Sequence, residues 1–155
     1  FQLLTQAAGR AGRGNMPGIV LIQTINPEHY AIQAAASQDF EKFYEKELNF
    51  RRLMRYPPFA ALANILVRSE DRQQALERSE QLERLVLPAP EGMKLLGPAE
   101  APVPRLREEY RYQLLLKSTS RPKLHEVLTR VLDFARQEKW SSSSLVVDVD
   151  PMTLL

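Results

Sequence analysis

Beyond residue 60 the spacing of apolar side chains changes several times along the chain, and this order restricts the possible folds more than any other feature. Every second residue is apolar over residues 61–67, which is typical of a half-buried strand. The same alternation returns over residues 110–117. Shorter apolar runs predict strands over residues 93–97 and 145–149, and the first of these is followed by a proline-rich stretch over residues 98–104.

Two helical patterns lie between these strands. Asp71 is a good N-cap for a helix that extends to about residue 86, and Ser120 is a good N-cap for another. The second helix has a clear apolar stripe, formed by Leu124, Val127, Leu128, Val131, Leu132 and Ala135. The order is therefore β-α-β-β-α-β. It predicts an α+β domain over residues 60–155, with four antiparallel strands and two helices on one face, the ferredoxin-like arrangement.

The first 36 residues follow a different pattern, which resembles the end of a parallel α/β lobe. It predicts a helix over residues 2–13, a buried strand over residues 19–24 and a helix over residues 28–36. The sheet neighbours of that strand are expected to lie upstream of this chain. We therefore expect residues 1–36 to be less ordered than residues 60–150.

Residues 37–59 are predicted to link the two parts. A helix begins near Ser37 and stops near Tyr56, because Pro57 and Pro58 prevent it from continuing. Aromatic residues recur along this helix at helical spacing. We interpret them as the contact that docks one part of the chain on the other.

The most specific motif is Q-x-x-G-R-x-G-R, which extends from Gln6 to Arg13. An arginine carries a permanent charge and a planar fork of donors that matches phosphate oxygens. Gly9 and Gly12 allow the backbone to approach a ligand or a second domain closely. The motif resembles the sixth conserved motif of superfamily 2 helicases, in which arginines reach ATP held by the other motor lobe. Considered alone, Arg10 and Arg13 could instead stabilise a helix C-terminus.

Other parts of an ATP site are missing from the sequence. It contains no G-x-x-x-x-G-K-[ST] phosphate loop and no Asp-Glu pair after a strand-like run, and a nucleotide motor needs both. The chain also begins at Phe1, within a helical pattern. We therefore interpret it as the C-terminal piece of a larger protein and expect it not to hydrolyse ATP alone.

Composition narrows the possible partners and surroundings. The net charge is only +2, so nucleic-acid binding requires a local basic patch rather than a basic protein. Cysteine is absent, which excludes disulfides and thiolate metal sites and fits a cytoplasmic protein. No apolar run approaches the roughly 20 residues that span a bilayer, so no membrane partner is expected.

Several segments extend the resemblance to nearly the whole chain. They occur in one order: FQLLTQAAGRAGRGNMPGIVLIQT at the start, then R-Y-P-P-F, L-G-P-A, R-Y-Q-L-L-L and V-D-V-D-P. Together they resemble the C-terminal end of the PriA family, the primosomal proteins N′. The resemblance implies a bacterial, nucleoid-associated ATP-dependent helicase that moves 3′ to 5′ on stalled replication forks. Residues 1–36 would then end its second, RecA-like motor lobe.

The resemblance also implies ligands and partners. ATP and magnesium would bind the full-length protein, with Arg13 as the transition-state arginine, Arg10 as a supporting phosphate ligand, and Gln6, Gly9 and Gly12 beside the nucleotide. The family's zinc module lies in a part that is not present here. The expected partners are branched or forked DNA, single-stranded DNA-binding protein and other primosome proteins.

A basic cluster interleaved with aromatic residues is the best local candidate for contacting DNA. It contains Arg105, Arg107, Arg111 and Lys117 together with Tyr110 and Tyr112. Glu108 and Glu109 dilute its charge, and the alternation directs both tyrosines into the core. The basic side chains are equally compatible with a solvated surface.

Arg121 and His125 lie one turn apart at the start of the helix that Ser120 caps. A helix start with an adjacent arginine suits a carboxylate, and the place resembles the family's contact for the acidic tail of single-stranded DNA-binding protein. An exposed helix start is an equally good interpretation, because His125 replaces an expected amide side chain. No metal is predicted, since Asp148 and Asp150 lack a third ligand at a suitable spacing and are interpreted as structural.

Two alternatives stay open. The isolated chain could be a DNA- and protein-binding module without catalytic activity, or it could be the end of a different superfamily 2 helicase.

Overall fold

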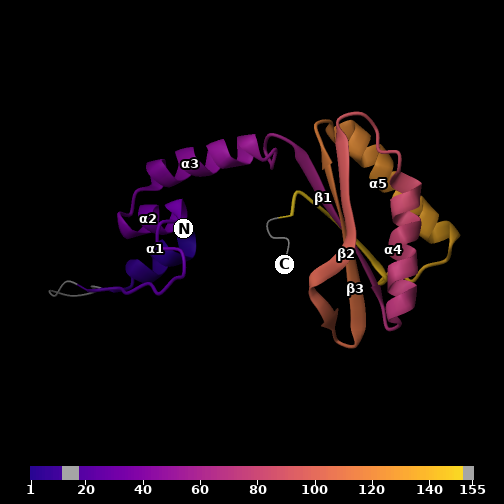
Figure 1. Cartoon of the computed structure of the whole chain (residues 1–155), viewed down its shortest axis with the longest axis horizontal. Coiled ribbons are helices and arrows are strands. Elements are labelled where there is room, and N and C mark those ends of the chain that lie inside the picture. Colours follow the sequence, from indigo (N-terminus) through magenta and orange to yellow (C-terminus); the bar gives the residue numbers. More distant parts are fainter. Residues whose placement is uncertain (12–17, 152–155) are drawn as a thin grey trace. The chain divides into compact units, whose positions relative to one another are not determined.

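The computed structural model describes residues 1–11 and 18–151, which belong to two compact units, Phe1–Met54 and Arg55–Leu155 (Figure 1). Each unit has its own packing. No helix in the described ranges combines the length and the hydropathy that crossing a bilayer requires.

The N-terminal unit contains the helices α1 (Gln2–Ala8), α2 (Tyr30–Ala36) and α3 (Phe40–Leu53). Aromatic rings join them. Phe1 stacks on Phe43 of α3 with ring centroids 4.5 Å apart, and the ring of Tyr30 lies 6.1 Å from that of Phe43. The aromatic side chains of the linking helix therefore pack on the residues that precede it in this unit.

The helix boundaries differ from those expected. α1 ends at Ala8, with Gly9 as its C-cap, instead of extending to residue 13. α2 begins at Tyr30, because His29 is the N-cap and its Nδ1 accepts a hydrogen bond of 3.2 Å from the amide of Ala31. α3 begins at Phe40, because the carboxylate of Asp39 accepts a bond of 2.9 Å from the amide of Lys42.

The predicted strand over residues 19–24 is wrong for the structure of this chain. Residues 18–24 have no strand conformation, and Ile19 and Leu21 are 87% and 92% exposed. A strand requires a neighbour that accepts and donates its backbone hydrogen bonds. Within the described part of the N-terminal unit, no strand is present to supply one.

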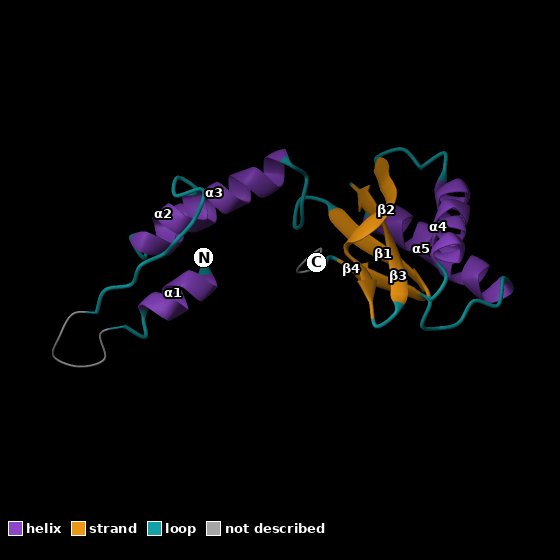
Figure 2. Ribbon diagram, turned by 60° about the horizontal axis from the view of Figure 1, so that its bottom comes forward, coloured by secondary structure: helices purple, strands orange, loops and turns teal. Residues whose placement is uncertain are grey.

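The C-terminal unit is a two-layer α+β structure. It comprises β1 (Ala61–Ser69), α4 (Arg72–Val86), β2 (Met93–Leu106), β3 (Glu109–Ser118), α5 (Arg121–Gln137) and β4 (Leu145–Val149). The strands form one antiparallel sheet in the order β2-β3-β1-β4. Both helices lie on the same side of it (Figure 2). The predicted order of elements and the four-stranded antiparallel sheet are confirmed.

The core lies between the sheet and the two helices. Alternation places Ile65 and Val67 of β1 beside Leu114 and Leu116 of β3 on this face, and all four are fully buried. Leu82 of α4 and several residues of the α5 stripe pack on them, namely Leu124, Val127, Leu128 and Val131. The residues between these on the strands therefore face away from the helices.

β2 is longer than expected, because the proline-rich stretch over residues 98–104 continues the strand instead of ending it. Two irregularities in the pairing with β3 accommodate it, one between Leu96 and Ala99 and one between Glu100 and Arg105. Gly97 lies in the first of these with φ +95°, where a Cβ atom would approach the carbonyl oxygen of Gln113 to 2.6 Å. Bulges and edge strands are the places where a sheet tolerates proline.

Candidate functional site

The described part of the Q-x-x-G-R-x-G-R motif lies on α1 and in the turn that follows it. Gln6 is exposed on the helix, and Gly9 and Arg10 are exposed at its C-terminal end. Gly9 has φ −68°, a conformation open to any residue, although a Cβ atom there would lie 3.3 Å from the carbonyl oxygen of Thr5. Gly12 and Arg13 fall outside the described residues. Gln6 and Arg10 therefore both face solvent.

The second candidate region is the end of the β2–β3 hairpin. β2 ends at Leu106 and β3 begins at Glu109, and these two residues pair with each other. The turn between them consists of Arg107 and Glu108, with φ +51° and +69°. Such a two-residue turn normally contains Asn-Gly or Asp-Gly, because positive φ brings a Cβ atom too close to the backbone carbonyl oxygen, which Gly avoids and Asn and Asp tolerate best.

Register in the sheet adds a residue that the sequence analysis missed. Arg68 of β1 lies directly opposite Arg111 of β3, on the face away from the helices. Arg68, Arg107 and Arg111 line one surface hollow of about 200 Å³, together with Leu106 and Glu109. Arg68 directly follows the alternating run over residues 61–67, and continuing the alternation puts it on the solvent-facing side of β1. Only the pairing of β1 with β3 shows that it lies beside Arg111.

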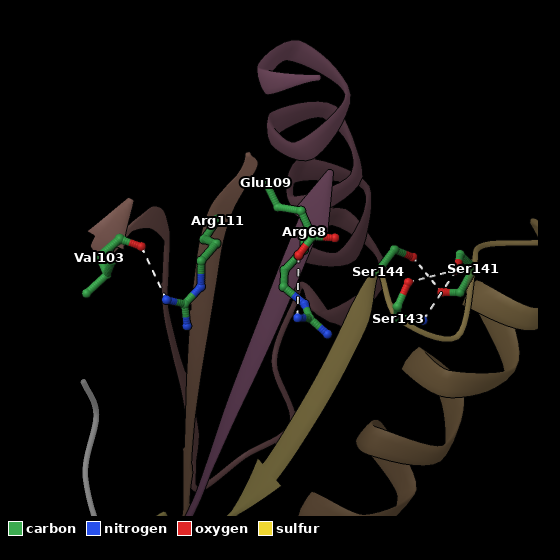
Figure 3. A network of polar contacts seen from close by, with 7 residues as sticks. All are labelled: Arg68, Val103, Glu109, Arg111, Ser141, Ser143 and Ser144. Atoms are coloured by element: carbon green, nitrogen blue, oxygen red, sulfur yellow. Dashed lines mark hydrogen bonds and ion pairs between the residues drawn. The ribbon is translucent and has the colours of Figure 1, made fainter. Parts of the chain in front are cut away.

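The contacts of the two facing arginines are long. Arg68 donates from Nη1 to Oε2 of Glu109 at 3.5 Å, and Arg111 donates from Nη1 to the carbonyl oxygen of Val103 at 3.4 Å (Figure 3). Charge-assisted bonds are usually about 2.7–2.9 Å. The backbone of Arg68 is held firmly, since its amide donates to the carbonyl of Ser144 at 2.8 Å.

The remaining members of the predicted basic cluster do not line this hollow. The guanidinium of Arg105 lies 5.1 Å from the ring centroid of Tyr110. Lys117 is six residues from Arg111 along β3, about 20 Å at the usual rise, and its Nζ lies 3.9 Å from the ring centroid of Tyr56. The structure therefore brings Arg107 and Arg111 together and separates Lys117 from them. Tyr112 is buried as expected, whereas Tyr110 is only half-buried.

Arg121 and His125 line another surface hollow of about 220 Å³, on the first turns of α5. Its apolar wall consists of Leu124, Leu128 and Val149. Arg121 is already paired: its Nη2 lies 2.6 Å from Oδ2 of Asp150. The side chain of Arg121 nevertheless stays 63% exposed. The hollow therefore combines an exposed arginine that already has one carboxylate partner with an apolar wall.

Asp150 has a structural role, as expected. Its Oδ1 accepts a bond of 3.0 Å from the amide of Leu62, whose carbonyl accepts a bond of 2.7 Å from the amide of Asp150. Burial raises the pKa of the Asp150 carboxyl, but the bonds from Leu62 and Arg121 outweigh it and hold the pKa below its usual value. Among the described residues, no three His, Asp or Glu side chains are placed to hold a metal ion.

Comparisons with known proteins agree on one family. A family model described as the primosomal protein N C-terminal domain matches residues 52–152. The chain is 36% identical over 157 residues to the replication restart protein PriA of Bacillus subtilis, covering 100% of this chain and 20% of that protein. It is 39% identical over 160 residues to replication restart protein PriA of Synechocystis, covering 99% and 18% respectively.

A third relative, replication restart protein PriA of Treponema pallidum, is 37% identical over 156 residues, covering 100% of this chain and 23% of that protein. The chain therefore spans about a fifth of the length of these relatives. Among solved structures, the designed protein Foldit4 shares 9% identity and superimposes with a TM-score of 0.44 over 58% of this chain and 92% of its own, a similarity too low to indicate function.

Proposed function

Because this chain belongs to the PriA family of replication restart proteins, we propose that its parent is an ATP-dependent 3′–5′ DNA helicase that recognises stalled forks and assembles the primosome. The observation that carries this proposal is the Q-x-x-G-R-x-G-R motif in a chain that aligns with the family from end to end. This chain supplies the end of the second motor lobe and the C-terminal domain.

In the motor, Arg13 is the residue that completes a nucleotide pocket on the other lobe. Its guanidinium neutralises charge that develops on the transferring phosphoryl group, while Arg10 binds a neighbouring phosphate and Gln6 orients the nucleotide. Gly9 and Gly12 keep the backbone close to the nucleotide. Magnesium and the phosphate loop belong to the remainder of the parent, since the sequence here carries neither a P-loop nor a Walker-type acidic pair.

The exposed apolar residues of the N-terminal unit support a RecA-like lobe in the parent. Ile19 and Leu21 are almost fully exposed in this chain, although they belong to a run with strand-like composition. We assign residues 19–24 to a strand that pairs with the sheet of the parent's second motor lobe. Pairing would satisfy the backbone groups and bury the apolar side chains together.

The C-terminal unit is assigned to fork binding. Its β-α-β-β-α-β order and its strand order of β2-β3-β1-β4 support a ferredoxin-like domain. The hairpin end of the sheet concentrates Arg107 and Arg111, and Arg105 extends the basic surface along β2. Lys117 contributes a separate contact at the opposite end of β3.

The hollow on α5 is assigned to the acidic tail of single-stranded DNA-binding protein. Arg121 and His125 lie at the positive end of a helix and suit a carboxylate, and the wall of Leu124, Leu128 and Val149 suits an apolar side chain next to it. The specific observation that favours this assignment is the ion pair of Arg121 with Asp150, because the geometry of this guanidinium allows it to bind a carboxylate.

In the full-length parent, Arg13→Ala is expected to lower ATP turnover by about 10³-fold, since an arginine of this kind supplies that part of the rate. Affinity for forked DNA is expected to stay within a few-fold of wild type. Steady-state ATPase assays with saturating DNA measure the first and anisotropy the second. Arg136→Ala on the exposed end of α5 is the control, and unchanged turnover in Arg13→Ala would remove Arg13 from catalysis.

The 155-residue chain is expected to bind forked DNA with an affinity that falls as salt rises. About three phosphate contacts give a slope of roughly −3 in log K against log salt, and Arg107→Gln reduces its magnitude by about 1. Arg136→Gln removes the same charge from α5 and should leave the slope unchanged. An affinity that does not respond to salt would exclude phosphate contacts by the hairpin.

A peptide of acidic residues with a free C-terminal carboxylate is expected to bind the hollow on α5. Arg121→Ala should weaken binding about tenfold or more, because it removes the charged partner of that carboxylate. Calorimetric titration measures the affinity, with Arg136→Ala as the matched control and a C-terminally amidated peptide as the ligand control. Equal affinities for the two variants would place the peptide elsewhere.

A further inference from the structure

Arg68 has a position for which neither packing nor pairing accounts. It is a charged residue at the end of a central strand, with a side chain only 29% exposed, and it faces another guanidinium directly across the sheet. Like charges in directly opposed positions destabilise an antiparallel pair. Three guanidiniums line the hollow between the strand ends, and Glu109 supplies the only carboxylate that the described residues place in its lining.

The hydrogen bonding of this pair is incomplete. The described residues include three buried side-chain atoms without a hydrogen-bond partner, and two of them are the Nε atoms of Arg68 and Arg111. Elsewhere in the chain the arginines Arg51, Arg72 and Arg121 contact carboxylates at 2.6–2.8 Å. A buried polar group without a partner loses its hydrogen bonds to water and gains none in return, which destabilises the fold. The chain therefore holds two guanidiniums together without supplying enough acceptors for them.

The adjacent turn also has an arrangement that is unfavourable for stability. Arg107 and Glu108 both have positive φ, a conformation that strains an ordinary residue and that Asn-Gly would adopt more easily. The turn thus places an arginine at the rim of the hollow at the expense of turn stability. Strained backbone combined with unsatisfied donors is more typical of a binding site than of a stabilising element.

We propose that Arg68 and Arg111, with Arg107 at the rim, form a seat for one phosphate of a bound DNA strand, and that this phosphate displaces the carboxylate of Glu109 from Arg68. The inference rests on the proposed binding of DNA by the C-terminal unit and adds to it a residue and a competing internal ligand. In the free chain the carboxylate holds the position of the anion weakly, at 3.5 Å.

The chemistry of the hollow favours a phosphodiester as its ligand. Two guanidinium forks present donors to several oxygens at once, and a phosphodiester offers two unbridged oxygens that share one charge. Three guanidiniums and one carboxylate leave the hollow with a net positive charge. This charge attracts an anion even before the carboxylate of Glu109 is displaced. A DNA strand also delivers adjacent phosphates, so the neighbouring cations of the hairpin can engage at the same time.

The inference is tested by measuring the affinity of the 155-residue chain for forked DNA by anisotropy at several salt concentrations. Arg68→Gln is expected to weaken binding about tenfold at low salt, on every sequence alike, and to reduce the salt slope by about 1. Arg136→Gln is the control for loss of a positive charge. The fluorescence of Trp140, which packs beside the core, verifies that each variant is folded.

The role of Glu109 is tested with a charge-matched neighbour. Glu108→Gln and Glu109→Gln remove the same charge one residue apart, and Glu108 is exposed in the turn. Glu109→Gln is expected to tighten binding about threefold beyond the effect of Glu108→Gln, because a competing ligand is removed. In an Arg68→Gln background this extra gain should disappear, since the carboxylate then has no guanidinium to occupy.

The results of these experiments distinguish failure of the proposed fork binding from failure of the phosphate seat alone. If the wild-type chain binds no DNA, the proposed fork binding fails and the phosphate seat fails with it. If the chain binds DNA with a dependence on Arg107 but Arg68→Gln equals Arg136→Gln, only the phosphate seat is overturned. Equal effects of Glu108→Gln and Glu109→Gln would overturn the displacement. Binding of an acidic peptide instead of DNA in this hollow would assign it to a protein partner.

Discussion

The burial of one face of the sheet by α4 and α5 determines where the charged residues of the C-terminal unit can lie. Ile65 and Val67 on β1 and Leu114 and Leu116 on β3 must all face the helices. Since side chains alternate along a strand, this requirement sends Arg68 and Arg111 to the opposite face. A slip of one residue in the register would expose the core and bury the charges, so the packing that stabilises the unit also brings the two guanidiniums together.

The arginines of the unit differ in how completely the chain satisfies them. Arg121 contacts Asp150 at 2.6 Å, and Asp150 in turn exchanges two hydrogen bonds with Leu62. That arrangement ties the start of α5 to the end of β4. Arg68 and Arg111 have long contacts and Nε atoms without partners. A protein that needed these two residues only for stability would gain more from apolar side chains, which is why we relate them to a ligand.

Much of the C-terminal unit could be predicted from the sequence, because its pattern is strong and local. Alternation over residues 61–67 and 110–117 and the caps Asp71 and Ser120 predicted two strands and two helices close to their observed positions. The length of β2 could not be predicted, since prolines usually end a strand and only the bulges opposite β3 accommodate them here. The hairpin turn could not be predicted either, because Arg107 and Glu108 are not the residues that such a turn favours.

The candidate site could be predicted only in part from the sequence. Arg107 and Arg111 were recognised as basic residues near one another, but grouping them with Lys117 ignored the length of β3. Arg68 is separated from Arg111 by more than 40 positions in the sequence, and only the register of β1 on β3 makes them neighbours. Residues 19–24 were predicted as a strand from their composition, yet a strand also needs a partner, which the described N-terminal unit does not contain.

We propose that the hairpin end of the sheet, and not the helical layer, is the surface of the C-terminal unit that meets DNA. Hydrogen–deuterium exchange of the 155-residue chain, with and without forked DNA, tests it most directly. We expect slower exchange of amides over residues 66–69 and 103–111 when DNA is bound, and no change over α4. Protection confined to α4 and α5, with the hairpin unaffected by bound DNA, would contradict the account.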